Sequence, residues 1–254
     1  MKILRVLFVV CAVLISFSEV PSTGAQVPPD AAETASPQPV IIDTDIGDDI
    51  DDAFALALAL KSPQLKILGV TTTFGDTEMR ARLLDRYLQA VGRSDIPVFA
   101  GPETKTDNAM TQVAYAKQIP EKRHGDGAVF ILREAQDHPG EITLIGIGPL
   151  FTVRRAIERD PATFKKIKRV VIMGGSIYRG YGLDAQGKPK APEPEWNILN
   201  DPAGLEALLS SGVSGACLGL RRAFLAWRTG LPPVNDSGRK LARGWRRSRR
   251  RVRP

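Results

Sequence analysis

Six aspartates stand within ten consecutive residues, from Asp43 to Asp52, between an apolar run at 40–42 and an apolar stretch that begins at Ala53. So many carboxylates at one junction repel one another, and they are unfavourable neighbours for hydrophobic segments. A hard cation that takes oxygen ligands, such as Ca²⁺ or Mg²⁺, would relieve the repulsion. Helix capping, the structural alternative, uses one or two acids and does not account for six. The spacing therefore predicts a metal site.

The elements that must position these acids follow from the hydrophobic pattern after residue 39. Short runs rich in Val and Ile alternate with helical patterns, as expected for parallel strands covered on both faces. The runs predict strands at 40–42, 65–73, 96–100, 142–148 and 169–174. The patterns between them predict helices at 52–61, 77–91, 128–137, 150–158 and 202–211. We therefore expect a doubly wound α/β fold, a mostly parallel sheet with helices on both faces, whose site lies at the carboxyl ends of the strands.

The first 25 residues have the pattern of a secretory signal peptide: Lys2 and Arg5, an apolar run at 6–17, and small residues up to a cleavage point near Ala25. The apolar run is shorter than the roughly 20 residues of a membrane helix, so no membrane span is expected after cleavage. With only two cysteines in the chain, no disulfide framework is expected. The sequence thus predicts a secreted or periplasmic protein with a flexible linker at 26–38.

The net charge of +7 is unevenly distributed along the chain. Residues 213–254 hold 12 of the 35 Lys and Arg side chains and a single acid, so this segment carries +11 while residues 1–212 carry −4. No aromatic interleaving and no recognised nucleic-acid motif accompany the basic segment, and a specific nucleic-acid partner is therefore not expected.

Several motifs resemble one family. DTDIG at 43–47 with DDAFAL at 51–56 resembles the N-terminal signature of inosine-uridine-preferring nucleoside hydrolases. Six further segments fall in the family's order: VTTTFG at 70–75, IPVFAG at 96–101, HGDG at 124–127, IGPL at 147–150, VIMGG at 171–175, and EWN at 195–197 with DP at 201–202. Together they cover about residues 39–212, which we take as the folded domain.

The resemblance implies Ca²⁺-dependent hydrolysis of the N-glycosidic bond of ribonucleosides to ribose and free base, with the ion holding the attacking water and the ribose hydroxyls. By position, Asp45 and Asp52 would ligate the ion through their side chains and Ile147 through its backbone carbonyl. Asp51 would be the general base that deprotonates the water. The segment between Gly47 and the Asp-Asp pair is two residues longer than in the shortest form of the motif, so Asp49 is a rival for that role.

Further residues would contact the substrate, again by resemblance. Asp76, Glu195 and Asn197 would contact the ribose, Met173 would line its pocket, and Asp43 would orient its neighbours or the sugar. Asp76 stands where the family often has Asn, and both types accept a hydrogen bond from a hydroxyl. His124 would assist the departing base, with a loop histidine satisfied by solvent as the structural alternative. Trp196 would either pack on the substrate or belong to the core.

The sequence departs from the family after Gly212. The family domain continues for roughly a hundred residues more, and this later part supplies another Ca²⁺-ligating aspartate and a histidine for the leaving group. Neither has a match in the Arg-rich segment 213–254, which we interpret as a disordered tail produced by truncation or a frame change. The hypothesis predicts weak Ca²⁺ binding, slow hydrolysis, and an exposed sheet edge that favours homo-oligomers.

Two other functions fit part of the pattern. Asp-x-Asp after an apolar strand also occurs in phosphatases whose first aspartate attacks phosphorus, here Asp43, but that reading leaves the segments at 124–127 and 195–197 unexplained. A non-catalytic protein that binds nucleic acid or anionic surfaces through its basic tail would show steeply salt-dependent binding, lost on deletion of residues 213–254.

Overall fold

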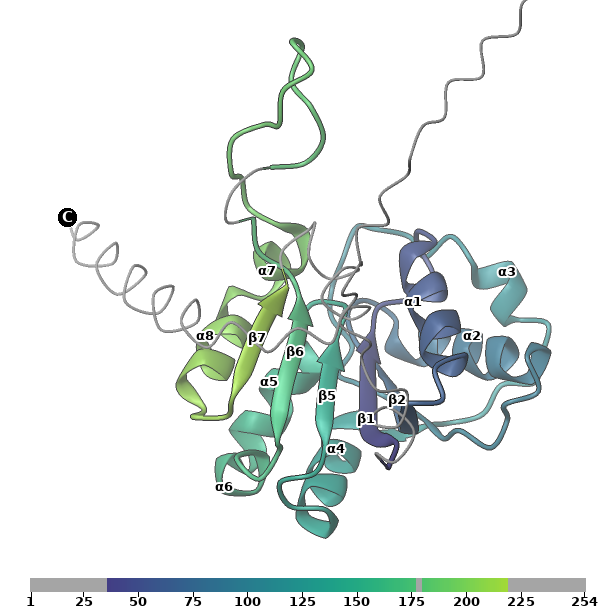
Figure 1. Ribbon diagram of the computed structural model, residues 1–254. Helices are drawn as coiled ribbons and strands as arrows, with labels where there is room; N and C mark the ends of the chain where they lie inside the picture. The colour runs from purple at the N-terminus through teal and green to yellow at the C-terminus, as the bar shows by residue number, and fades with distance from the viewer. Residues whose placement is uncertain (1–35, 177–179, 219–254) are drawn as a thin grey trace, which may run out of the picture. The chain divides into compact units, whose positions relative to one another are not determined.

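A computed structural model describes residues 36–176 and 180–218, which contain one sheet in which every strand pair is parallel. The sheet order is β4-β3-β2-β1-β5-β6-β7 (Figure 1). Its strands are β1 (Gln38–Thr44), β2 (Leu65–Thr72), β3 (Val98–Ala100), β4 (Gly125–Asp126), β5 (Thr143–Gly146), β6 (Arg169–Met173) and β7 (Gly215–Leu218). The predicted doubly wound α/β fold is confirmed, and all five predicted strands are present.

Eight helices lie in the described part of the chain. They are α1 (Asp51–Leu60), α2 (Thr77–Ala90), α3 (Val113–Ala116), α4 (Gly127–Asp137), α5 (Phe151–Arg159), α6 (Pro161–Phe164), α7 (Trp196–Asn200) and α8 (Pro202–Ser210). The five helices expected from the sequence are among them, each within two residues of its predicted ends. The short helices α3, α6 and α7 were not predicted, because four or five residues are too few to show a helical period.

Two separate hydrophobic cores lie on opposite faces of the sheet, and adjacent residues of β1 contribute to different ones. Ile41 packs with α4, α5, α6 and α8 in one core, while Ile42 packs with α1 and α2 in the other. Side chains of a strand alternate between faces, so a Val- and Ile-rich strand such as β1 serves both layers at once. This double burial holds the carboxyl end of β1 rigidly between the two helix layers.

The sheet order places a topological switch point between β1 and β5. From β1 the chain moves outward through β2, β3 and β4, then returns to pair β5 with the other side of β1. Asp43 near the end of β1 is in register with Gly146 at the end of β5. Ligands of open α/β sheets bind at such a point, outside the carboxyl ends of the strands. The aspartate cluster and the loop after β5 both lie there.

The last strand extends the sheet beyond the predicted domain end. β7 pairs with β6 from Val170 to Met173, although it lies past residue 212 and inside the segment interpreted as a tail. Its four residues, Gly-Ala-Cys-Leu, are too few for the pattern to show a strand. The remainder of that segment, 219–254, and the predicted signal peptide and linker up to residue 35 lie outside the described residues. In the part of the chain that the structure describes, no helix is long and apolar enough to cross a membrane.

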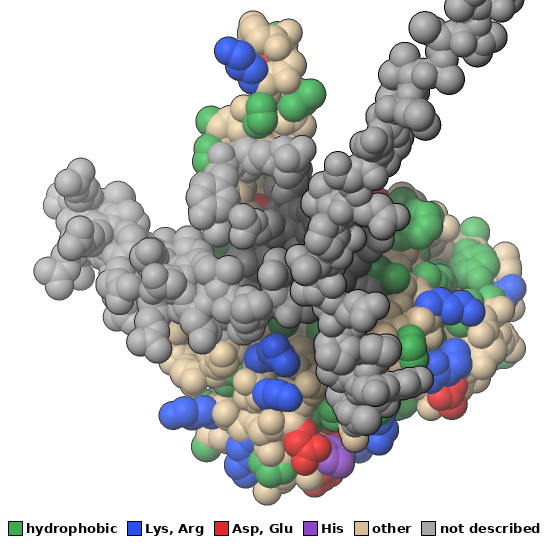
Figure 2. Space-filling model, viewed as in Figure 1, with side chains coloured by type: hydrophobic (Ala, Val, Ile, Leu, Met, Phe, Trp, Pro, Cys, Tyr) green, Lys and Arg blue, Asp and Glu red, His purple; other side chains and the backbone are tan. Residues whose placement is uncertain are grey.

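One surface feature concerns α1, whose outer side carries apolar residues at four-residue spacing. Ile50, Phe54 and Leu58 are 65%, 67% and 40% exposed. In the space-filling view, apolar side chains gather over α1 and α3, whereas basic and acidic side chains are interspersed on the lower part of the same face (Figure 2). The sequence DDAFALALAL explains the exposure, because no polar residue follows Asp52 in this helix.

Candidate active site

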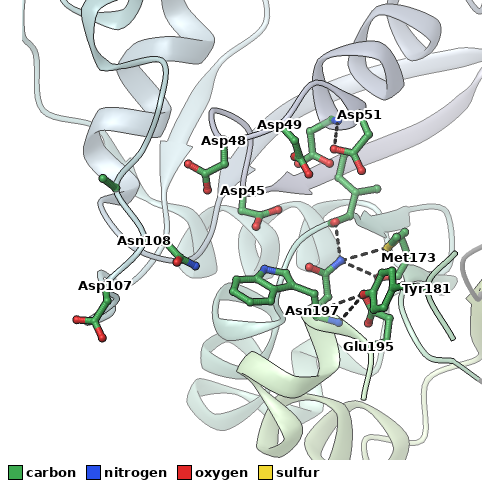
Figure 3. A pocket seen from close by; sticks show the side chains of 14 residues that line it. Asp45, Asp48, Asp49, Asp51, Asp107, Asn108, Met173, Tyr181, Glu195 and Asn197 are labelled. Atoms are coloured by element: carbon green, nitrogen blue, oxygen red, sulfur yellow. Dashed lines mark hydrogen bonds between the residues drawn. The ribbon is translucent and has the colours of Figure 1, made fainter. Parts of the chain in front are cut away.

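A pocket of about 510 Å³ opens at the switch point. Its walls come from the loop after β1, from a segment before α3, from the loop after β5, from the end of β6, and from the start of α7 (Figure 3). The residues that line it are Asp45, Asp48, Asp49, Asp51, Asp52, Asp107, Asn108, Ala109, Ile147, Met173, Tyr181, Glu195, Trp196 and Asn197. The predicted ligands Asp45, Asp52 and Ile147 therefore meet in one place.

The acidic wall is built by the loop that joins β1 to α1. Gly47 has φ of +128°, a conformation that a residue with a side chain rarely adopts, and it turns the chain between Asp45 and Asp48. Asp51 and Asp52 then form the first turn of α1, where negative charge is favourable. The Thr44 hydroxyl donates a hydrogen bond to Asp52 Oδ2, and the Asp52 amide donates to Asp51 Oδ1 at 3.0 Å.

Burial gives this wall unusual electrostatics. It raises the pKa of Asp45 from its ordinary 3.8 to about 7, although the Arg80 charge opposes the change. Burial also raises the pKa of Asp52 well above its usual range, and the nearby Asp45 charge adds to the effect. A hydrogen bond that protonated Asp49 donates to Asp51, followed by burial, raises the pKa of Asp49. Ionised carboxylates in this pocket are therefore unfavourable without additional positive charge.

The donor chemistry suits a hard cation, since the carboxylates and the Ile147 carbonyl all offer oxygen. Within residues 36–176 and 180–218, no group of three or more His, Cys, Asp or Glu side chains is arranged to hold an ion by itself. An ion bound by Asp45 and Asp52 would thus need backbone, water or substrate oxygens to complete its coordination. A sugar with neighbouring hydroxyls provides such oxygens.

The opposite wall is polar but tightly held. Glu195 is 3% exposed, and its carboxylate accepts hydrogen bonds from the amides of Gly175, Asn197 and Ile198, each at 3.1 Å. Asn197 Nδ2 donates to the Ile147 carbonyl at 2.9 Å and to the Met173 carbonyl at 3.1 Å. These bonds fix the start of α7 against the ends of β5 and β6.

Gly148 allows the two walls to approach. A Cβ atom at this position would lie 2.6 Å from Asp45 Oδ1 and 2.9 Å from the Asp45 amide nitrogen. Any larger residue would push Asp45 away, because such distances are far inside van der Waals contact. The IGPL segment therefore contributes Ile147 to the pocket lining, and the missing side chain of Gly148 leaves room for Asp45.

The comparisons with known proteins fit this geometry. A family model of inosine-uridine preferring nucleoside hydrolases matches residues 40–241. The chain belongs to this family.

Similar nucleoside hydrolases come from plants and bacteria. Uridine nucleosidase 1 of Arabidopsis thaliana is 30% identical over 196 residues, covering 71% of this chain and 56% of that protein. The pyrimidine-specific ribonucleoside hydrolase RihA of Enterobacter sp. (strain 638) is 33% identical over 199 residues, covering 72% and 59%. The solved structure of a plant nucleoside hydrolase, PpNRh1, matches with a TM-score of 0.60 at 30% identity, covering 72% and 60%. The chain thus spans less than two thirds of the length of these nucleoside hydrolases.

Three residues expected at the nucleoside hydrolase site do not line the pocket, and Asp43 is the first. Its side chain is completely buried at the end of β1, where Thr71 Oγ1 donates to Asp43 Oδ1 at 2.6 Å. Burial raises the pKa of Asp43 to about 8. Direct contact with the sugar was therefore the wrong part of the prediction, and Asp43 lies behind Asp45. The same burial argues against the phosphatase alternative, in which Asp43 would have to reach a phosphorus atom.

Asp76 is the second, and its environment is that of a helix cap. It is exposed, and its Oδ1 accepts a hydrogen bond from the Met79 amide at 2.9 Å, at the start of α2. The side chain is thus committed to the helix that it precedes and is absent from the pocket lining. The sequence analysis gave this residue only the substrate-binding role, and the structure shows a helix cap instead.

His124 is the third. Its ring lies between Glu78 (Nδ1 to Oε2, 2.8 Å) and Asp85 (Nε2 to Oδ2, 2.9 Å), and its side chain is 1% exposed. Burial alone would lower the pKa of His124, but hydrogen bonds to Asp85 and Glu78 outweigh it and raise that pKa. Neither the catalytic role nor the solvent-satisfied alternative describes it. The neighbouring Asp126 caps α4 by accepting from the Ala128 amide at 2.8 Å.

Some lining residues were not predicted. Asp107, Asn108 and Ala109 come from a segment without regular structure, so neither periodicity nor a motif marks them. Tyr181 also lines the pocket, and its hydroxyl accepts from the Trp196 amide at 2.8 Å. Trp196 is 44% exposed in the lining, which favours the substrate-packing alternative over a core position.

Proposed function

We propose that this protein hydrolyses the N-glycosidic bond of ribonucleosides with the help of a bound divalent cation, Ca²⁺ by preference. The observation that carries the proposal is the meeting of Asp45, Asp51, Asp52 and the Ile147 loop with Glu195 and Asn197 around one pocket. Family membership supports the reaction class. The preference for Ca²⁺ rests on the all-oxygen donor set, which suits a hard cation of flexible coordination.

The chain's own residues would divide the work between the two walls. Asp45, Asp52 and the Ile147 carbonyl would hold the cation, which when bound lowers the pKa of water and orients ribose hydroxyls. Asp51 would accept the proton of the attacking water as its oxygen bonds to the anomeric carbon. The carbon–nitrogen bond would break with its electron pair on the base, which takes a proton from solvent. Glu195 and Asn197 would orient the ribose.

The choice of Asp51 over Asp49 as general base can be tested within the same loop. Asp51 lies in the first turn of α1 and lines the pocket, whereas a hydrogen bond that Asp49 donates to Asp51 raises the pKa of Asp49 and favours its protonated form. Loss of a general base typically slows a reaction about 10²–10⁴-fold. Asp51→Asn should therefore lose at least about 100-fold in kcat, and Asp49→Asn much less. The reverse order would assign the base to Asp49.

The reaction itself is tested by reducing-sugar release from inosine and uridine, with Ca²⁺, with Mg²⁺ and with a chelator. Ribose release that depends on the cation supports the proposal, whereas phosphate release from a monoester without ribose release would contradict it. Asp95→Asn is a matched control, because Asp95 is a surface acid that pairs with Arg93 and does not line the pocket. It should leave turnover unchanged.

We also propose that the protein is exported and that it associates with a second copy of itself. Residues 1–25 support secretion, which N-terminal sequencing of the mature protein would test. The exposed apolar side chains of α1 would suit contact with a second copy, and light scattering of the purified protein would measure its mass.

A further inference from the structure

Arg80, in the first turn of α2, is a buried cation beside the acidic loop. Arg80 is only 1% exposed. Nε donates to the Phe74 carbonyl at 2.8 Å, Nη1 donates to the carbonyls of Ile46 (2.9 Å) and Asp45, and Nη2 donates to Asp48 Oδ2 at 2.8 Å. All four acceptors belong to the loops that follow β1 and β2. Arginine is rarely buried so completely, and the set of partners accounts for its burial.

The acidic loop depends on such outside contacts. Residues 45–50 lie in neither helix nor strand, so their backbone groups are not held by regular hydrogen bonding. On one side, Thr111 Oγ1 donates to the carbonyls of Gly47 (2.9 Å) and Asp48 (2.7 Å). On the other side, Arg80 holds the carbonyls of Asp45 and Ile46. Of these two side chains, Arg80 is the one that hydrogen-bonds the predicted ligand Asp45 itself.

The charge of Arg80 acts in the same direction as its geometry. It forms an ion pair with Asp48, one of the pocket acids, and it lies close enough to Asp45 to oppose the rise in that residue's pKa. Asp48 Oδ1 is buried without a hydrogen-bond partner among the described residues, so Arg80 engages only one of its two oxygens. A planar guanidinium reaches these several acceptors in fixed directions, which a lysine ammonium does not reproduce.

We propose that Arg80 is a positioning residue of the hydrolase: it fixes the backbone of residues 45–48 so that Asp45 faces the cation and the substrate. The inference rests on the proposed function for its kinetic consequences, but the bracing itself does not. Among the described residues that line the pocket, Arg80 hydrogen-bonds the Asp45 carbonyl and the Asp48 carboxylate, and it would act through them.

The experiment compares Arg80→Met and Arg80→Lys with Arg82→Met in the full chain. Arg82 lies on the same helix, and its Nε donates to the Ile119 carbonyl at 3.0 Å, away from the acidic loop. Amide hydrogen exchange of residues 45–52 reports the bracing without reference to activity. Titration with Ca²⁺ alone and measurement of kcat and KM for inosine or uridine report the consequence for the site.

For Arg80→Met we expect exchange of residues 45–52 to accelerate at least about tenfold, Ca²⁺ affinity to fall about tenfold, and kcat at saturating Ca²⁺ to fall about 100-fold, because small misplacements are costly in catalysis. KM should change less than about threefold, since Glu195 and Asn197 keep their contacts. Arg80→Lys should recover only part of each loss. Arg82→Met should match the wild type in all three measurements even if its thermal stability falls.

Unchanged exchange in residues 45–52 of Arg80→Met would overturn the inference, as would equal losses in Arg82→Met or full recovery in Arg80→Lys. A wild-type chain that neither binds Ca²⁺ nor releases ribose would instead reject the proposed function. In that event the exchange measurements alone would still decide whether Arg80 braces the loop.

Discussion

Two groups of acids in the described part of this protein differ in what balances their charge. Around His124, the carboxylates of Glu78 and Asp85 contact the imidazole, and Lys122 Nζ lies 2.8 Å from Asp85 Oδ2. Burial alone would raise the pKa of Asp85, but hydrogen bonds from His124 and Lys122 lower it. In the pocket, burial raises the pKa of Asp45 and Asp52, and Arg80 is the cation that contacts this loop.

The group around His124 is balanced as a stabilising network is, whereas the pocket acids are unbalanced as in a functional site. In the group around His124, acids and bases neutralise one another and form one another's hydrogen bonds, so they need no further partner. The pocket acids outnumber the cations that contact them in the described chain, and a surplus of this kind costs stability. Such a cost is typical of functional sites, where perturbed pKa values concentrate. Substitutions in the two groups should therefore have different effects on stability and on activity.

The largest effect is expected for Asp45→Asn. Loss of a ligand of the proposed cation removes several kcal/mol of transition-state stabilisation, or about 10³-fold in kcat/KM. The same change removes a buried charge, so the metal-free variant should melt at a higher temperature than the wild type. Calorimetry of the metal-free variant should show the higher melting temperature. Ribose release by the same preparation, with Ca²⁺ added, should show the loss of activity. A variant that loses stability and activity together would contradict the contrast between the two acid groups.

The pH dependence of metal-free stability is the next test. Asp43 and Asp45 have folded pKa values of about 8 and about 7 against an ordinary value of 3.8, so the folded state binds more protons than the unfolded chain within that window. The free energy of unfolding should therefore fall as pH rises from about 4 to about 8. In a chelator, the melting temperature should be higher at about pH 5.5 than at about pH 8.5.

Added Ca²⁺ should stabilise the protein more at the higher pH, where the pocket carboxyls are ionised. Asp45→Asn provides the control, because removing one of the titrating groups should flatten the profile. A chelated wild-type protein that gains stability with rising pH across this window would show that the pocket acids do not carry the buried charge assigned to them.

The sequence predicted the scaffold well because periodicity reports burial. The Val- and Ile-rich run of β1 could be identified as a strand buried on both faces. Asp45, Asp52 and Ile147 were named from the resemblance of their segments to the family's motifs. Asp107 and Asn108 could not be found, because their segment has no periodic pattern and is placed by Thr111, which contacts Gly47 and Asp48. An acid before a helix, such as Asp76, suits both a cap and a ligand, and only three-dimensional placement distinguishes them.

His124 provides the third prediction, from the balanced group. His124→Gln keeps the polarity of the ring but removes its charge, leaving Glu78 and Asp85 facing each other. We expect a loss of about 1–2 kcal/mol in the free energy of unfolding, moderated by the partial exposure of Glu78, with turnover within about twofold of wild type. Because the pKa of His124 is raised, its contribution is full below pH 6.5 and is lost as pH rises through the folded value.

Urea denaturation at two pH values would measure this loss. His138→Gln is the matched control: the His138 side chain is 48% exposed and lies 3.9 Å from Glu134, so its replacement should change stability by less than about 0.5 kcal/mol. A large fall in kcat for His124→Gln, with stability unchanged, would return this histidine to the catalytic role that its motif suggested.

The smallest effect is expected at Asp76, where the capping and ligand roles diverge most clearly. Asp76→Ala removes the acceptor for the Met79 amide and should cost about 1 kcal/mol of stability, while Asp76→Ser, another good cap, should cost less. Both variants should keep KM for the nucleoside, because the side chain does not line the pocket. If Asp76 instead bound a ribose hydroxyl, both replacements would raise KM even where the serine restored the cap. KM and the free energy of unfolding, measured for both variants, therefore decide which role the residue has.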